Sequence, residues 1–87
     1  MKEVVLISGM TWEEFYKGER SIFNSVAANP IFSKLVSLGP NELTEVEFRE
    51  LKEMLDKKGI NMSGCQTHND LFEIATTITS KSIALLN

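Results

Sequence analysis

Apolar residues recur every three or four positions through most of this chain, the spacing that predicts helices with one buried face. The exception is residues 3–8, where a short β-branched run is typical of a strand or of an extended arm. Two proline-containing breaks and one long polar stretch divide the rest. The pattern predicts an extended segment over 1–10, two or three short helices over 11–38, a helix over 44–58, a polar loop over 61–69 and a helix over 70–86.

Capping residues mark the expected helix boundaries. Thr11 and Thr44 each stand three residues before a glutamate, which is the pattern of a capping box. Asn29 is a good N-cap and Pro30 a good first helical residue, so a fresh or kinked helix is expected there. Gly59 follows two lysines and is typical of a C-terminal cap, with the apolar residue after it folding back on the helix.

The last expected helix contains a stretch that is poor in helix formers. Residues 76–80 read Thr-Thr-Ile-Thr-Ser, and a strand pairing with residues 3–8 is the alternative there. The predicted fold class is mainly α, a small single domain of four or five short helices with an extended N-terminal segment. The alternative is α+β, with a small two- or three-stranded sheet that includes residues 3–8.

Composition narrows the classes of function. The 87 residues make one domain, 1–87, and the net charge of −3 lacks the basic excess of a nucleic-acid binder. The longest clean apolar run, Val4 to Ile7, is too short for a membrane span, so no membrane association is expected. A single cysteine excludes an internal disulfide and favours a reducing, cytoplasmic location.

Large aromatic residues are concentrated in the first third of the chain. Trp12, Phe15 and Tyr16 fall on one face of a very short helix, which cannot turn all of them inward. Tryptophan and tyrosine are favoured in the centres of protein interfaces. We therefore expect a protein-binding surface at these three residues, with Trp12 and Tyr16 partly exposed.

Two loops rich in small hydroxyl residues lead into helix starts, where backbone N–H groups attract anions. Neither matches a phosphate-binding or dinucleotide-binding motif, and capping alone explains both. If they converged, they could hold a small anionic or nucleotide ligand. The residues of this alternative site are Ser8, Gly9, Thr11, Ser63, Gly64, Thr67 and His68.

Cys65 and His68 are the only copies of each residue type. Their spacing is half of a zinc site, but the remaining ligands are absent, so no metal is expected. The same pair could serve as a nucleophile and its base, although the sequence shows no oxyanion hole. The simpler interpretation is a loop cysteine that packs as a small hydrophobe and a histidine beside a helix start.

The function that fits these observations is a small, acidic, regulatory interaction protein without enzymatic activity or cofactor. It would act as an adaptor or inhibitor of a larger protein. Because a chain of this size has a marginal core, self-association into a homo-oligomer is a further expectation. The alternative is an oligomeric binder of a small anionic ligand, and the second alternative is a Cys65 and His68 enzyme.

Overall fold

Five α-helices and one 3-10 turn make up the computed structural model, which describes residues 4–7, 9–18 and 20–86. The fold class is mainly α, as predicted, with an extended segment at the N-terminal end. The elements are α1 (Trp12–Tyr16), α2 (Ile22–Ala27), α3 (Pro30–Leu38), η1 (Pro40–Glu42), α4 (Glu45–Lys57) and α5 (His68–Leu86).

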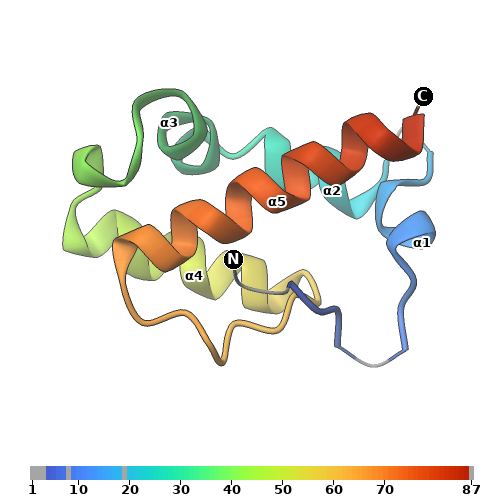
Figure 1. Cartoon of the computed structure of the whole chain (residues 1–87), viewed down its shortest axis with the longest axis horizontal. Coiled ribbons are helices and arrows are strands. Elements are labelled where there is room, and N and C mark those ends of the chain that lie inside the picture. The colour runs from blue at the N-terminus through green and yellow to red at the C-terminus, as the bar shows by residue number, and fades with distance from the viewer. Residues whose placement is uncertain (1–3, 8, 19, 87) are drawn as a thin grey trace.

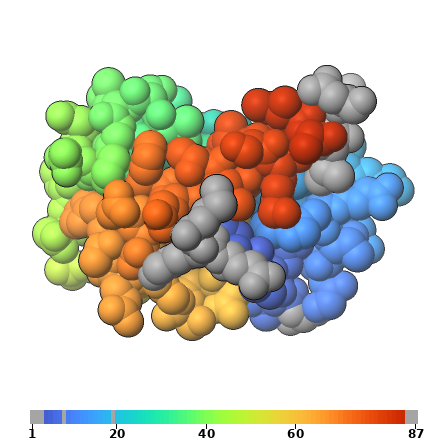
Figure 2. Space-filling view, viewed as in Figure 1, coloured from blue at the N-terminus to red at the C-terminus, as the bar shows by residue number. Residues whose placement is uncertain are grey.

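The helix α5 runs diagonally through the middle of the molecule and organises the other elements (Figure 1). It contacts α1, α3, α4 and η1. Its inward side carries fully buried residues, among them Leu71, Ala75 and Ile78. Its outward side stays at the surface, where it crosses one face of the molecule (Figure 2).

The helix starts lie where the capping residues predict them. The Thr11 hydroxyl accepts from the backbone N–H of Glu14 at 3.2 Å, and Thr44 and Glu47 form both halves of a capping box. The Asn29 side-chain oxygen caps α3 by accepting from the backbone N–H groups of Ile31 and Phe32, with Pro30 as the first helical residue. Local side-chain chemistry therefore sets these boundaries.

The start of α5 corrects one predicted boundary. Thr67 is the N-cap, because its hydroxyl accepts from the N–H of Asp70 while the Asp70 carboxylate accepts from the N–H of Thr67. This reciprocal pairing starts the helix at His68 rather than at residue 70. His68 and Asn69 consequently belong to the first turn of α5 and not to the polar loop.

The threonine-rich stretch 76–80 lies inside α5, so the alternative of a strand there was wrong. The hydroxyls of Thr77 and Thr79 donate to the carbonyls of Glu73 and Ala75, four residues earlier. Threonine hydroxyls bonded in this way are satisfied within the helix. The buried side chain of Ile78 supplies tertiary packing that outweighs the weak helix propensity of its neighbours.

The N-terminal segment 4–7 pairs with the loop after α4 instead of with residues 76–80. The Ile7 N–H donates to the Gly59 carbonyl at 2.7 Å, and the Asn61 N–H donates to the Val5 carbonyl at 2.8 Å. These bonds flank one isolated antiparallel bridge between Leu6 and residue 60. Within the described residues, this bridge is the only β-type pairing.

The loop residues 59–60 complete the C-terminal end of α4. Gly59 has φ +97°, and the Ile60 N–H donates to the Leu55 carbonyl at 3.2 Å. Together with the bond from the Gly59 N–H to the Asp56 carbonyl, this is a Schellman motif. Leu55 and Ile60 are both fully buried, so the predicted fold-back on the helix is confirmed.

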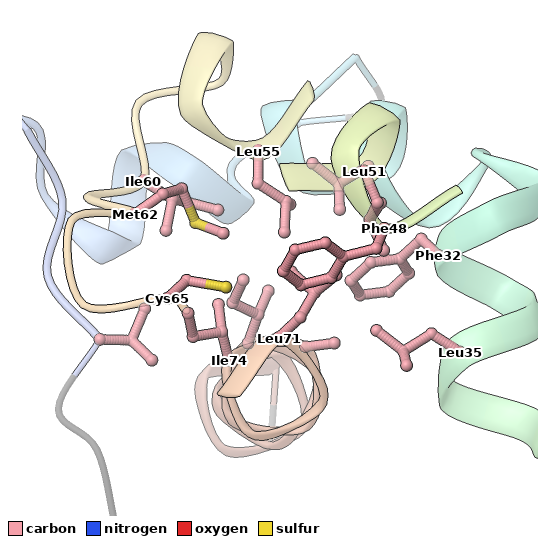
Figure 3. Packing of buried hydrophobic residues seen from close by; sticks show 14 of the residues in the cluster. Phe32, Leu35, Phe48, Leu51, Leu55, Ile60, Met62, Cys65, Leu71 and Ile74 are labelled. Atoms are coloured by element: carbon pink, nitrogen blue, oxygen red, sulfur yellow. The ribbon is translucent and has the colours of Figure 1, made fainter. Parts of the chain in front are cut away.

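One hydrophobic cluster joins segment 4–7, the five α-helices and the loop after α4, and Figure 3 shows part of it. Side chains of α4, α5 and the loop after α4 meet in its centre, and α3 closes it at one side. The fully buried large side chains are Phe15, Val26, Leu35, Leu51, Leu55, Ile60, Cys65, Leu71 and Ile78.

Candidate functional site

The aromatic residues of the first third form a stacked cluster between α1, α2 and α5. The Trp12 ring lies parallel to the Tyr16 ring with centroids 6.0 Å apart, and edge-on to Phe15 at 5.5 Å. Phe23 of α2 packs against Tyr16 at 5.0 Å. Ring pairs at these separations add to the stability of a core, so the cluster fixes the orientation of each ring.

The three predicted protein-binding residues differ in how far they are buried. Phe15 is fully buried and Tyr16 is only 8% exposed, whereas Trp12 is half-buried. The expected partial exposure of Tyr16 was therefore wrong. The reason is that α1 lies against α5, so that Phe15 and Tyr16 face the core and Trp12 lies at the rim.

The hydroxyl group of Tyr16 forms a hydrogen bond with α5. Its hydroxyl donates to the main-chain carbonyl of Ile78, which lies 62 residues later in the chain. Burial of the side chain raises its pKa to about 12, because the charged phenolate loses solvation there. Tyr16 thus ties α1 to α5 and serves the fold.

Lys81 lies beside Trp12 at the surface. Its ammonium group lies 5.1 Å from the centre of the indole ring, within the range of a cation–π contact. Sequence reasoning missed this residue, because it lies 69 positions away from Trp12 in a helix with no unusual charge pattern. Trp12 and Lys81 together define what we call the Trp12 surface.

The side chains of Cys65 and His68 lie in different surroundings and make different contacts. Cys65 is 1% exposed, and its sulfur is directed into the hydrophobic cluster near Met62 and Ile74 (Figure 3). His68 stacks on Phe48 of α4 with centroids 4.5 Å apart, and its Nε2 lies 3.8 Å from the Glu45 carboxylate. The thiol therefore packs as an apolar side chain, and the imidazole covers Phe48.

The two hydroxyl-rich loops occupy different parts of the molecule (Figure 1). Gly9 and Thr11 lie in the connection to α1, whereas Ser63 and Gly64 form a turn in the loop between α4 and α5. Thr11 and Thr67 use their hydroxyls as helix caps. Ser8 of this alternative site lies outside the described residues.

A shallow groove runs along the outer face of α4, with a volume of about 580 Å³. Arg49 and Lys52 line it together with Glu53 and Asp56, and the loop residues 61–63 form its other wall. The two positive and two negative side chains give this groove no net sign. Charges of both signs therefore line the groove.

The described residues form neither a metal site nor a membrane-spanning helix. No three His, Cys, Asp or Glu side chains of that part lie close enough together to hold a metal ion. Among the described helices, none combines the length and the hydropathy that crossing a lipid bilayer requires. Comparisons with protein-family models, with curated proteins and with solved structures found no match to this chain.

Proposed function

We propose that this chain is a small protein-interaction domain, an adaptor or an inhibitor, which binds a larger protein through the Trp12 surface. The observation that carries the proposal is the half-buried indole of Trp12, stacked on Tyr16 and covered by Lys81. We also propose that it acts in the cytoplasm, which the single, buried cysteine favours.

The geometry of Trp12 is that of an interface anchor. Tryptophan is enriched among the residues that contribute most to protein binding. Because its ring is held by Phe15 and Tyr16, little side-chain entropy would be lost when a partner covers it. The Lys81 ammonium beside the ring can pair with an acidic group on the partner, which would add specificity to the apolar contact.

The experiment compares variants of the full chain in affinity purification from the cells that produce it. We expect wild type to retain one protein in stoichiometric amount. Trp12→Ala should weaken that complex by about 30-fold, the effect of removing a hot-spot side chain. Val46→Ala is the matched control, since Val46 is a 64% exposed apolar residue on α4 and should bind as wild type does.

Loss of folding must be distinguished from loss of binding, because Trp12 also packs on the core. Thermal unfolding of each variant gives that distinction, and Lys81→Ala tests the same surface without removing an aromatic ring. Fluorotryptophan incorporated at the single tryptophan gives one fluorine NMR signal, which should shift on binding. An unshifted signal in the complex, or a folded Trp12→Ala chain that binds as wild type does, would refute the proposal.

A further inference from the structure

The N-terminal segment 4–7 is bound to the rest of the molecule as a separate strand would be. Its partner residues 59–61 are more than fifty positions away in the sequence. Two backbone hydrogen bonds, from Ile7 to Gly59 and from Asn61 to Val5, hold it in antiparallel register. Main-chain pairing of this kind gives affinity for an extended peptide whether or not the peptide belongs to the same chain.

The surface on which the segment lies, which we call its groove, is formed by apolar residues. Ile60, Met62 and Cys65, which are at most 5% exposed, belong to the same hydrophobic cluster as Val4. Gly59 lies so close to Met10 that an added Cβ would meet the Met10 Cε at 2.7 Å. The site therefore fits an extended apolar segment that lies flat against the loop after α4.

The outward side of the segment is also apolar. Val5 and Ile7 are 46% and 40% exposed, whereas Val4 is only 7% exposed. This alternation is that of a strand with one face on the core. The exposed face has no cover within the described residues and is available for contact with a second molecule.

The turn after the segment depends on one glycine. Gly9 has φ +72°, a left-handed conformation that other residues adopt only with strain. No atom lies within 4 Å of the position of an added Cβ, so space does not restrict a side chain there. A residue that favours an extended backbone at this position would direct segment 4–7 away from its own groove.

We propose that the groove also accepts segment 4–7 of a second copy of this chain, so that two copies exchange N-terminal segments and form a symmetric dimer. The contacts described for the segment join it to residues 59–61 and to the hydrophobic cluster, and each can be made identically between copies. This inference does not involve Trp12 and stands independently of the proposed function.

The monomer–dimer equilibrium measures the exchange. Within one chain, the segment competes at an effective concentration in the millimolar range, so wild type should be mainly monomeric at micromolar concentration. Gly9→Val disfavours the turn through which each chain binds its own segment 4–7. We expect it to lower the dimer dissociation constant by about 100-fold in analytical ultracentrifugation.

Gly18→Val is the matched control, because Gly18 also has a positive φ, +84°, and open space around it. It should introduce similar strain without promoting the dimer, since it lies outside the segment and its groove. Gly9→Val chains that stay monomeric up to millimolar concentration, or equal dimerisation of both variants, would overturn the proposal.

Cross-linking identifies the face that is used. In a Gly9→Val, Cys65→Ala background, one chain carries Leu6→Cys and the other carries Ile60→Cys, the two positions of the antiparallel bridge. After the chains are mixed and oxidised, exchange predicts an interchain disulfide between them. A chain with Val46→Cys in place of Ile60→Cys should give none. A dimer that forms without the first disulfide would mean association through another face and would overturn the exchange.

Discussion

Tyr16 shows how a single polar atom is accommodated in this apolar core. Its ring packs between Trp12, Phe15 and Phe23, and its hydroxyl reaches the Ile78 carbonyl of α5. A buried hydroxyl without such a partner would destabilise the fold by about 1–3 kcal/mol. The bond thus permits a tyrosine where the packing alone would suit a phenylalanine.

Removing this hydroxyl should alter stability and its pH dependence. We expect Tyr16→Phe to lower the free energy of unfolding by about 1 kcal/mol at neutral pH, since the Ile78 carbonyl loses a donor. The pKa of Tyr16 is raised by burial from 10.0 to about 12. The contribution of Tyr16 to the free energy of unfolding is complete below pH 10, where the folded and unfolded chains both keep the phenol proton.

Above pH 10 the unfolded chain loses the phenol proton first, so it binds fewer protons than the folded chain. The free energy of unfolding should therefore fall between pH 10 and about 12, by about 2–3 kcal/mol in total. Urea unfolding across this range should show the fall in wild type and a smaller one in Tyr16→Phe. The chain has one tyrosine, so tyrosinate absorbance reports it directly. A native midpoint near pH 10 would contradict this account.

At the scale of elements, α5 shows how burial decides secondary structure. Its residues 76–80 favour a strand by composition, yet they continue a helix whose buried side chains repeat at helical spacing. The hydroxyls of Thr76 and Thr77 both donate to the Glu73 carbonyl. Packing of one face therefore outweighs local preference.

Two neighbouring substitutions should separate the contribution of helix propensity from the contribution of packing. Thr77 is half-buried, so Thr77→Ala should raise the free energy of unfolding by about 0.5 kcal/mol, because alanine is the better helix former. Ile78 is fully buried, and Ile78→Ala should lower it by about 2–5 kcal/mol through the cavity it leaves. Urea unfolding followed by circular dichroism measures both. A loss of stability in Thr77→Ala equal to that in Ile78→Ala would contradict this division.

At the scale of the whole molecule, the elements differ in how firmly they are held. The helices α4 and α5 enclose the centre of the hydrophobic cluster, whereas segment 4–7 is attached at its edge (Figures 1 and 3). The segment has two backbone hydrogen bonds and a half-exposed face. Such a segment opens locally at a lower free energy than the core.

Native-state hydrogen exchange should reveal this difference. The amide protons of Ile7 and Asn61, which form the two bonds to the segment, should exchange faster than those of Leu51 and Leu55 in α4. Their exchange should also depend little on urea, because local opening exposes little surface. Protection of Ile7 equal to that of Leu51 would show that the segment opens only when the whole domain unfolds.

The candidate site could be predicted only in part. The sequence indicated an aromatic group near the first helix, and Trp12 does lie at the surface. It could not assign Phe15 and Tyr16 to the core, because their burial depends on the docking of α1 against α5. Lys81 carried no signal, since it reaches Trp12 only through that docking.

Local features of this protein follow from short stretches of its amino-acid sequence. Capping residues such as Thr44 and Asn29 set helix starts, and Gly59 sets a helix end, because these effects act over one helical turn. Features that depend on distant residues follow instead from the packing of the whole chain. Segment 4–7 pairs with residues 59–61, and the stretch 76–80 is helical, because burial in a common core selects among local alternatives that the chain leaves open.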